Sequence, residues 1–205
     1  MIFLLATSNK DKMIEFARIL EPLDIEVKIP SELGLSLPDV EETGTTFIEN
    51  ALLKAESGAE FSGYPTLADD SGICVDALDG APGIYSARYS GDEAGARLDK
   101  NKANNLKMLR ELDGVPEQQR TAHYTCAVAC VMPDGRKFTT EGYCFGKIAS
   151  SENGSNGFGY DPLFIPDEEP GDLTFGQLSS EIKDRLSHRS RAIHKMCDVL
   201  KKEVL

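Results

Sequence analysis

The sequence predicts an α/β protein, and three stretches carry this prediction. Residues 2–6 form a short apolar run, and apolar side chains at helical spacing follow over residues 13–20, so a strand leads into a helix. Residues 47–61 show the same helical spacing just before a second short strand-like run at 66–68. Residues 121–132 and 136–148 are strand-like and are joined by an Asp-Gly pair, which predicts a long β-hairpin.

The length and charge of the chain exclude several classes of protein. Its 205 residues suit one domain, or two lobes that share a core. A net charge of -12 argues against binding to a nucleic-acid backbone, so any polyanionic ligand must meet a local basic pocket. The first apolar run is too short for a signal peptide, and no stretch approaches the length of a membrane span. We therefore expect a cytoplasmic protein that binds neither nucleic acid nor a membrane.

The cysteines and the first strand of the hairpin are predicted to be core. The five cysteines are odd in number and include no C-x-x-C pair, so neither a disulfide framework nor a thiolate metal site is indicated. We expect them to be small buried hydrophobic side chains. Both faces of the first hairpin strand are apolar, which predicts a strand that is covered on both sides. One face carries Cys126, Val128 and Cys130, and the other carries Ala127, Ala129 and Val131.

The chemistry is expected around Asp69 and Asp70, two adjacent carboxylates that follow the short strand-like run at 66–68. A strand there delivers both carboxylates to its carboxyl end, where Ser71 and Gly72 turn sharply. Open α/β sheets bind ligands outside the carboxyl ends of their strands. Because consecutive strand side chains point to opposite faces, only one of the two faces a given ligand. The alternative is a turn in which Asp and Ser accept local hydrogen bonds.

The loop of residues 7–12 predicts a phosphate cradle. Hydroxyl, amide and two ammonium groups stand here beside the free N–H groups of a helix start, which favour anions. The alternative is simple N-capping by Ser8 or Asn9, with solvated lysines.

An acidic loop precedes the second predicted helix. Thr46 and Glu49 form a capping-box pattern at the start of that helix, and Lys54 lies further along it. Glu41 or Glu42, in the loop before the helix, is placed to hold a cation. The alternative is an acidic loop that is only solvated.

Two later stretches predict recognition of a flat ring. Phe158 and Tyr160 stand among glycines, which permit close approach to a base, and Asp161 can bond a base edge. The alternative is a rigid loop whose aromatic side chains pack into the core. His188 and Arg189 open the last helix, where positive charge is mildly unfavourable. We therefore expect an anionic or carbonyl-bearing partner beside them, the alternative being tolerated surface charge.

Residues 92–112 are polar and charged, and they predict a helix to which no chemistry is assigned. Its inward side chains are expected to be Leu98, Leu106, Leu109 and Leu112.

Six motifs follow one another along the chain. They are Thr7-Ser8-Asn9-x-x-Lys12, Thr46-Phe47-x-Glu49-Asn50-Ala51-x-x-Lys54-Ala55, Leu67-Ala68-Asp69-Asp70-Ser71-Gly72, Gly80-Ala81-Pro82-Gly83-Ile84-Tyr85-Ser86-Ala87-Arg88, Gly157-Phe158-Gly159-Tyr160-Asp161-Pro162 and Ser187-His188-Arg189. Together they resemble the motifs of the inosine/xanthosine triphosphate pyrophosphatase family over nearly the whole chain. Two positions depart from the family pattern, because Ser8 replaces a frequent Gly and Ile182 replaces a frequent acidic residue before Lys183.

The resemblance implies a fold and an activity. The family fold is a long, mixed, twisted central sheet with helices forming two lobes around a nucleotide cleft. In this chain it implies a single nucleoside-triphosphate pyrophosphatase domain over residues 1–205, with one chain-wide core. The implied activity is Mg²⁺-dependent hydrolysis of ITP, dITP and XTP to nucleoside monophosphate and pyrophosphate, which removes these non-canonical purine nucleotides from the pool. A homodimer is implied as well.

The resemblance also implies roles for individual residues. Glu41 and Asp70 would hold the metal, and Asp70 would be the catalytic base, with Asp69 as the alternative. Arg189, which only donates hydrogen bonds, would donate to the 6-oxo group of inosine and xanthine and disfavour the 6-amino group of adenine. The implied substrate-binding residues are Thr7, Ser8, Asn9, Lys10, Asp11, Lys12 and Lys54 at the phosphates, Ser71 on the nucleotide, Phe158, Gly159, Tyr160 and Asp161 around the base, and Lys183, His188 and Arg189 as base readers.

Two other functions compete with this one. A nucleotide-binding sensor would use the same residues without hydrolysis, but it would not need the carboxylates Glu41 and Asp70, which suit a Mg²⁺ ion. A pyrophosphatase for other nucleotides is the nearer alternative, and the base-recognition motifs argue against it.

Overall fold

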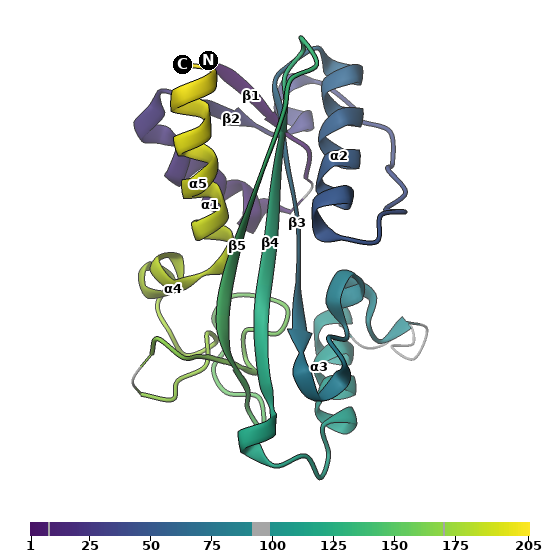
Figure 1. Ribbon diagram of the computed structural model, residues 1–205, viewed down its shortest axis with the longest axis vertical. Helices are drawn as coiled ribbons and strands as arrows, with labels where there is room; N and C mark the ends of the chain where they lie inside the picture. The colour runs from purple at the N-terminus through teal and green to yellow at the C-terminus, as the bar shows by residue number, and fades with distance from the viewer. Residues whose placement is uncertain (8, 92–98, 170) are drawn as a thin grey trace. The chain divides into compact units, whose positions relative to one another are not determined.

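The computed structural model describes residues 1–7, 9–91, 99–169 and 171–205, and it confirms the α/β class (Figure 1). Its strands are β1 (Ile2–Leu5), β2 (Glu26–Lys28), β3 (Thr66–Val75), β4 (Thr121–Val131), β5 (Lys137–Ile148) and β6 (Phe164–Pro166). Its α-helices are α1 (Lys10–Leu20), α2 (Phe47–Ser62), α3 (Lys100–Glu111), α4 (Ser180–Leu186) and α5 (His188–Glu203).

The strands form one mixed sheet in the order β2-β1-β3-β4-β5-β6. β1 pairs in parallel with β2 and β3, whereas β5 pairs antiparallel with β6. β4 and β5 are neighbours and form the predicted hairpin. Its turn is closed by a hydrogen bond of 2.9 Å from the Met132 N–H to the Arg136 carbonyl, and Gly135 has a φ of 88°, which glycine adopts readily.

The chain divides into two compact units. Unit 1 comprises Met1–Asp70, Cys126–Gly142 and His188–Leu205, and unit 2 comprises Ser71–Thr125 and Tyr143–Ser187. The buried apolar side chains of the described residues form three clusters, two in unit 1 and one in unit 2. A single domain with one chain-wide core stays a prediction.

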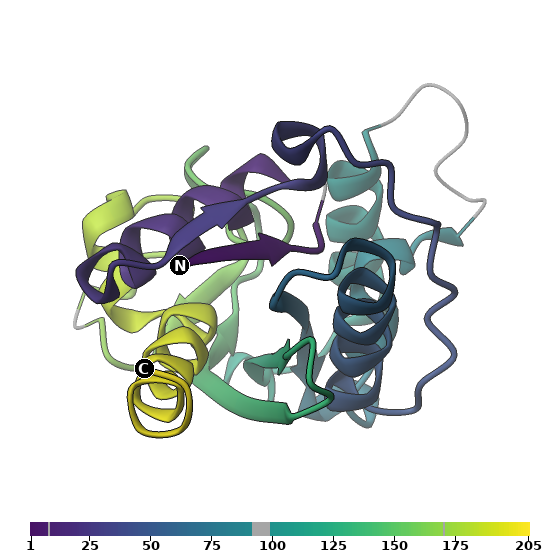
Figure 2. The ribbon, with the colours of Figure 1, turned by 90° about the horizontal axis from the view of Figure 1, so that it is seen from above.

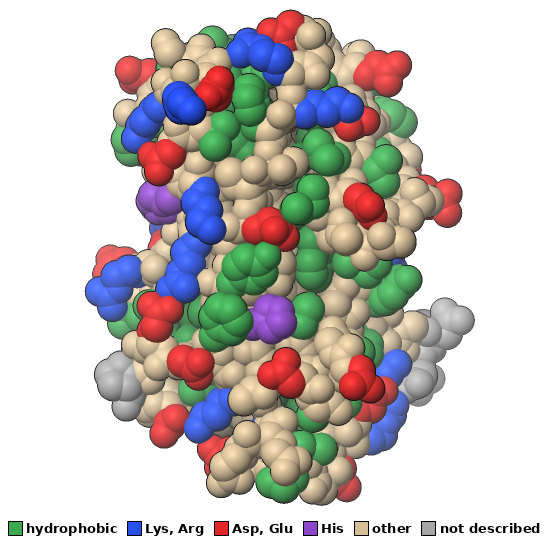
Figure 3. Space-filling model, viewed as in Figure 1, with side chains coloured by type: hydrophobic (Ala, Val, Ile, Leu, Met, Phe, Trp, Pro, Cys, Tyr) green, Lys and Arg blue, Asp and Glu red, His purple; other side chains and the backbone are tan. Residues whose placement is uncertain are grey.

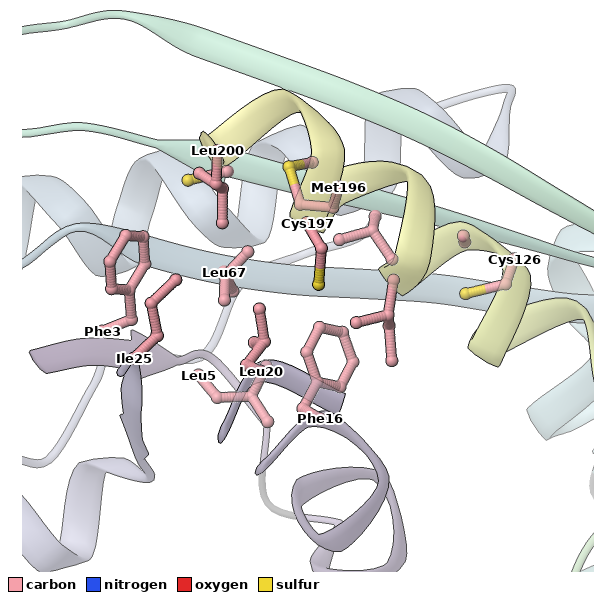
Figure 4. Packing of buried hydrophobic residues seen from close by; sticks show 14 of the residues in the cluster. Phe3, Leu5, Phe16, Leu20, Ile25, Leu67, Cys126, Met196, Cys197 and Leu200 are labelled. Atoms are coloured by element: carbon pink, nitrogen blue, oxygen red, sulfur yellow. The ribbon is translucent and has the colours of Figure 1, made fainter. Parts of the chain in front are cut away.

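In unit 1, helices α1 and α5 contact each other and cover one face of the sheet. Figure 2 shows α1 lying along β1 and β2, and Figure 4 shows the apolar side chains of α1 and α5 pointing toward those of the strands. Gly142 of β5 allows the close approach of α5, because a Cβ there would lie 2.1 Å from the His188 carbonyl oxygen. The labelled members of the cluster are Phe3, Leu5, Phe16, Leu20, Ile25, Leu67, Cys126, Met196, Cys197 and Leu200.

Helix α2 contributes a second, small-residue core to unit 1. Its alanines pack with Ala68 of β3 and with Ala127, Ala129 and Val131 of β4. Since Cys126, Val128 and Cys130 belong to the other unit 1 cluster, the prediction that β4 is covered on both sides is confirmed. The predicted capping box is also present, with the Thr46 hydroxyl accepting from the Glu49 N–H at 3.2 Å.

Unit 2 has an aromatic core around β4 and β6. The rings of Tyr124 and Phe164 pack edge to face with centroids 4.8 Å apart. On α3 the predicted inward face is partly wrong, because Leu106 is 46% exposed whereas Leu112 is fully buried. The α3 side that faces the core instead carries Ala103, Asn104, Asn105 and Met108. Leu98 lies outside the described residues.

Two further expectations concern the cysteines and the membrane. Four cysteines, namely Cys126, Cys130, Cys144 and Cys197, are buried as expected, and Cys74 is partly buried. Among the helices of the described ranges, none combines the length and the apolar character that crossing a membrane requires.

Candidate active site

Strand β3 carries Asp69 and Asp70 in its interior, not at its end. The predicted short strand with a sharp turn at Ser71 and Gly72 is wrong, because β3 continues to Val75. The polar residues do not end the strand, since both carboxylates find hydrogen-bond and ion-pair partners. Asp69 is 3% exposed and Asp70 is 8% exposed. As expected for neighbours on a strand, they contact different partners.

Asp69 is the centre of a buried ion-pair network in unit 1. Its Oδ2 atom lies 2.9 Å from the Lys12 ammonium and accepts a hydrogen bond of 3.2 Å from Arg189 Nε. Arg189 Nη1 also donates to Glu15 of α1 at 2.9 Å. Burial alone would raise the pKa of Asp69, but Lys12 and Arg189 hold that pKa well below its usual value of 3.8. Asp69 is therefore a firmly ionised carboxylate between two cations.

Asp70 has a different environment, formed by α2 and the loop before it. Its Oδ1 accepts a hydrogen bond of 3.0 Å from Lys54, and its Oδ2 accepts one of 3.4 Å from Asn50. Lys54 also donates to Glu42 at 2.9 Å. Burial raises the pKa of Asp70 above 3.8, even though Lys54 acts in the opposite direction. For Lys54, burial lowers the pKa, but the nearby carboxylates outweigh that effect and raise it.

Side chains of the predicted phosphate loop bind backbone N–H groups at the start of α1. The Asn9 N–H donates to the Thr7 hydroxyl at 3.1 Å, and the Lys12 N–H donates to Asn9 Oδ1 at 3.3 Å. Asn9 therefore caps the helix, as one of the two sequence interpretations has it. The Lys12 side chain points to Asp69, whereas Lys10 is exposed. Ser8 and the side chain of Asp11 lie outside the described part of the chain.

The predicted base-binding loop lies in unit 2 and is organised by Asp161. Its Oδ2 accepts hydrogen bonds from the Phe158 N–H at 2.7 Å and from the Lys183 ammonium at 2.6 Å. The Lys183 Nζ also lies 4.7 Å from the centroid of the Phe158 ring, a cation–π distance. Gly157 makes this arrangement possible, since a Cβ there would lie 2.0 Å from Asp161 Oδ2.

The two aromatic residues of this loop differ in their surroundings. Phe158 is only partly buried. Tyr160 is 4% exposed, belongs to the unit 2 core, and donates a hydrogen bond of 2.8 Å to the Ser86 carbonyl. The stacking interpretation therefore suits Phe158, and the core interpretation holds for Tyr160. Ser71 lies on the unit 2 part of β3 and is partly buried.

His188 and Arg189 are buried at the start of α5 in unit 1. The anionic partners expected for this pair are Asp69 and Glu15, which contact Arg189. Sequence reasoning missed Glu15, although it lies three positions after Lys12 and so on the same face of α1. In the loop before α2, Glu41 is exposed, and it is Glu42 that reaches Lys54.

The donor atoms of unit 1 suit a hard cation and a phosphorylated ligand. Carboxylate oxygens of Asp70 and of the acidic loop before α2 are the ligands that Mg²⁺ takes in proteins, usually one or two at a time. Within the described ranges, no group of three or more His, Cys, Asp and Glu side chains is gathered as a metal site. Lys12 and Lys54 add positive charge beside the carboxylates. Fold and cluster together define an α/β protein in which lysines of α1 and α2 are paired with two buried carboxylates of β3.

Comparison with known proteins identifies the family. The model of the Ham1 family matches residues 3–199, and the chain belongs to this family. A dITP/XTP pyrophosphatase of Geobacter sulfurreducens is 47% identical over 195 residues, covering 95% of this chain and 94% of the relative. A dITP/XTP pyrophosphatase of Bacillus subtilis is 43% identical over 197 residues, covering 96% of each chain. The resemblance seen in the motifs is thus confirmed.

Solved structures agree with the fold. The Ham1 protein of Staphylococcus aureus superposes with a TM-score of 0.85 at 39% identity, covering 99% of this chain and all of the other. A HAM1 protein of Coxiella burnetii also gives a TM-score of 0.85, at 34% identity, covering 98% of this chain and 99% of the other.

Proposed function

We propose that this protein hydrolyses the non-canonical purine nucleoside triphosphates ITP, dITP and XTP to nucleoside monophosphate and pyrophosphate. The observation that carries the proposal is the pair of buried carboxylates on β3, each with its own lysine. Lys12 contacts Asp69 at 2.9 Å and Lys54 contacts Asp70 at 3.0 Å. Phosphoanhydride hydrolysis needs such a combination, with cations for the phosphates and a carboxylate for water. The names of the relatives, dITP/XTP pyrophosphatase, support two of these substrates, dITP and XTP.

Mg²⁺ is the proposed cofactor, with Asp70 and Glu41 as its protein ligands. Both offer hard oxygen donors, and Glu41 lies in the loop that also brings Glu42 to Lys54. When bound, the ion would neutralise charge on the phosphates. Lys54 would then hold a phosphate oxygen, together with Lys12 and the residues of the loop at 7–12. A sensor would need the lysines but not the paired carboxylates.

Asp70 is the proposed general base, and Asp69 is the alternative. A base must take a proton from water, and a carboxylate with a raised pKa does so more readily than one with a lowered pKa. Burial raises the pKa of Asp70, whereas Lys12 and Arg189 lower that of Asp69 despite its burial. In this proposal water attacks the α-phosphorus and pyrophosphate leaves.

Base recognition is assigned mainly to unit 2. Phe158 would stack on the purine, and Lys183, held by Asp161 beside that ring, would donate to the 6-oxo group. Unpaired donors facing the 6-amino group of adenine would disfavour ATP. Gly159 and Tyr160 complete the proposed pocket, and His188 and Arg189 remain proposed base readers. Arg189 has a second role in this proposal, because it also holds Asp69.

A cytoplasmic homodimer is proposed as the working form. Its support is an aromatic surface on the unit 2 parts of β4 and β5, formed by the exposed Phe145 and the partly buried His123 and Tyr143. The ring centroids of His123 and Phe145 lie 5.6 Å apart, and Phe145 is 58% exposed. In Figure 3, hydrophobic side chains gather around a histidine over these strands. Light scattering on wild type and on Phe145→Asp tests this proposal. We expect wild type to be a dimer and the variant to be a monomer. A dimer in both would exclude this surface as the dimer interface.

The test of the function is product release from ITP, XTP, GTP and ATP, with Mg²⁺ and with EDTA, scoring pyrophosphate separately from orthophosphate. Pyrophosphate from ITP and XTP, lost in EDTA, is the expected result. Tight binding of ITP without product would favour the sensor instead. Turnover confined to other nucleotides would favour the related pyrophosphatase.

A further inference from the structure

Helix α3 buries two consecutive asparagines in unit 2. Asn104 is 3% exposed and Asn105 is 2% exposed. Asparagine is a poor residue for the interior of a helix, and its amide needs hydrogen-bond partners when it is buried. The contacts of these two side chains show why polar residues lie at these buried positions.

The Asn105 amide reaches the predicted base-binding loop directly. Its Nδ2 donates to the Gly159 carbonyl at 3.2 Å and to Glu152 Oε1 at 2.8 Å. Because both partners are acceptors, only the nitrogen of the amide can face them. The Asn105 Oδ1 atom is buried and has no hydrogen-bond partner within the described part of the chain. The side chain therefore contributes as a donor, and its two donor contacts join α3 to the loop.

Glu152 is fixed by the same helix. Lys102, three positions before Asn105 on α3, forms an ion pair with Glu152. Burial alone would raise the pKa of Glu152, but hydrogen bonds from Lys102 and Asn105 outweigh it and lower that pKa. Glu152 is therefore an ionised acceptor that holds the Asn105 amide in place.

Asn104 supports the next residue of the loop. Its Nδ2 donates to the Ser86 carbonyl at 3.1 Å, and its Oδ1 accepts from the Ser90 N–H at 2.8 Å. The Tyr160 hydroxyl donates to the same Ser86 carbonyl at 2.8 Å. Gly159 is thus held by Asn105, and Tyr160 is held at the carbonyl that Asn104 also binds.

We propose that Asn105 is a positioning residue for the base pocket, which fixes the backbone at Gly159 and thereby the place of Phe158 beside Lys183. The proposal rests on the proposed function, since it takes the loop at 157–161 as the part that binds the purine. Phe158 and Asp161 flank the held residues and are themselves joined by a hydrogen bond of 2.7 Å. A shift of the backbone at Gly159 would therefore move the ring and its lysine together.

The variant that tests the proposal is Asn105→Asp, with Asn101→Asp as its matched control. Asp has nearly the shape of Asn but presents a carboxylate to Glu152 and to the Gly159 carbonyl, so both contacts become repulsive. Asn101 is an exposed residue of the same helix, so its variant carries the same charge change without a buried contact. We expect Asn105→Asp to raise KM for ITP about 10-fold, with kcat within about 2-fold and inhibition by pyrophosphate unchanged.

A double variant separates positioning from stability. In Asn105→Asp/Glu152→Gln, the glutamine amide can donate to the new carboxylate, so the pair between these two side chains is restored. The Gly159 carbonyl still faces a carboxylate oxygen. We expect the double variant to recover most of the Tm lost in Asn105→Asp while KM for ITP stays raised. If KM recovers together with Tm, Asn105 is only structural and the proposal is overturned.

Hydrogen–deuterium exchange of the peptide over residues 156–163 provides a readout that does not depend on turnover. Faster exchange there in Asn105→Asp and in the double variant, but not in Asn101→Asp, supports the positioning role. Unchanged exchange overturns it. If wild type fails to hydrolyse ITP, the proposed function fails, and the exchange measurement still decides whether Asn105 holds the loop.

Discussion

The two units hold their candidate site residues by different means. In unit 1, Asp69 is bound by Arg189, which lies 120 positions away in the sequence, and the contacts are ion pairs between side chains. In unit 2, Asp161 binds the Phe158 N–H three positions away, and the contacts include several backbone groups. Unit 1 therefore relies on charge balance between side chains, whereas the loop of unit 2 adds backbone hydrogen bonds to the buried ion pair between Asp161 and Lys183.

A second contrast, in acid–base character, appears between two neighbouring residues of β3. Asp69 and Asp70 are adjacent and both buried, but their pKa values shift in opposite directions. Two cations surround Asp69, whereas burial dominates at Asp70. The acid–base character of a carboxylate is therefore set by the residues that the fold brings to it and not by its neighbours in the sequence.

The largest effect is expected at Asp70. Asp70→Asn removes the proposed base and metal ligand at nearly constant volume, so we expect turnover of ITP to fall at least about 10³-fold. Tm should fall only slightly, because the new amide oxygen can still accept from Lys54, although the amide nitrogen then faces the Asn50 Nδ2 donor. Steady-state kinetics and circular dichroism measure both effects.

The control for this prediction is Asp79→Asn. Asp79 is exposed and has a φ of 51°, a conformation that asparagine also adopts readily, so activity should be unchanged. Retained turnover in a correctly folded Asp70→Asn protein would overturn the role of Asp70.

The next largest effect is expected from Arg189→Ala, which tests the charge balance of unit 1. The substitution leaves Glu15 and part of Asp69 uncompensated in the interior, so we expect the free energy of unfolding to fall by about 3 kcal/mol. Chemical denaturation measures this loss. Arg18→Ala removes an exposed arginine of α1 and should change stability by less than about 0.5 kcal/mol.

Arg189→Ala also tests base reading. If Arg189 contacts the 6-oxo group, the ratio of kcat/KM for ITP to that for ATP should decrease in the variant. An unchanged ratio would leave Arg189 with its structural role at Asp69 alone.

Local signals predicted much of the fold and part of the site. The strand predicted at residues 2–6, the capping box at Thr46 and the two apolar faces of β4 each depend on neighbours in the sequence. The structure contains all three, with the strand ending at Leu5. The pairing of Glu15 with Arg189 could not be predicted, because it joins residues 174 positions apart. The prediction that β3 ends at Asp70 is wrong, because two adjacent aspartates are typical of a turn and the sequence does not show the cationic partners that let them lie inside a strand.

For helix α3, the prediction of which side chains face the core is partly wrong. Its leucines suggested the inward face, but Leu106 is exposed and Asn104 and Asn105 are buried. Polar side chains become core residues when backbone carbonyls of a loop need donors, and no periodicity of apolar residues reports that need.

A smaller effect, confined to the loop of unit 2, is expected from Gly157→Ala. Gly157 has a φ of 75°, and a Cβ there would lie 2.0 Å from Asp161 Oδ2. Gly114→Ala is the matched control, since its φ is also 75° but a Cβ there would meet nothing within 4 Å. Each variant carries the left-handed backbone cost of about 1–2 kcal/mol. Only Gly157→Ala should also raise KM for ITP; an equal rise in both would show that backbone strain, not the contact with Asp161, is responsible.

The smallest effect concerns Glu152 and the pH dependence of stability. Its pKa in the folded state is lowered from 4.5, where burial raises it but hydrogen bonds from Lys102 and Asn105 lower it more. The folded state therefore binds this proton less tightly than the unfolded state does. The resulting stability is present above pH 4.5 and is lost as the pH falls through the folded pKa. Because Glu152 is partly exposed, we expect this contribution to the free energy of unfolding to be less than about 1 kcal/mol.

Urea denaturation between pH 6 and 3 measures this contribution. The free energy of unfolding should fall less steeply with decreasing pH in Glu152→Gln than in wild type. Glu60→Gln, at an exposed position of α2, should follow wild type. Parallel curves for Glu152→Gln and wild type would show that Glu152 does not couple to folding.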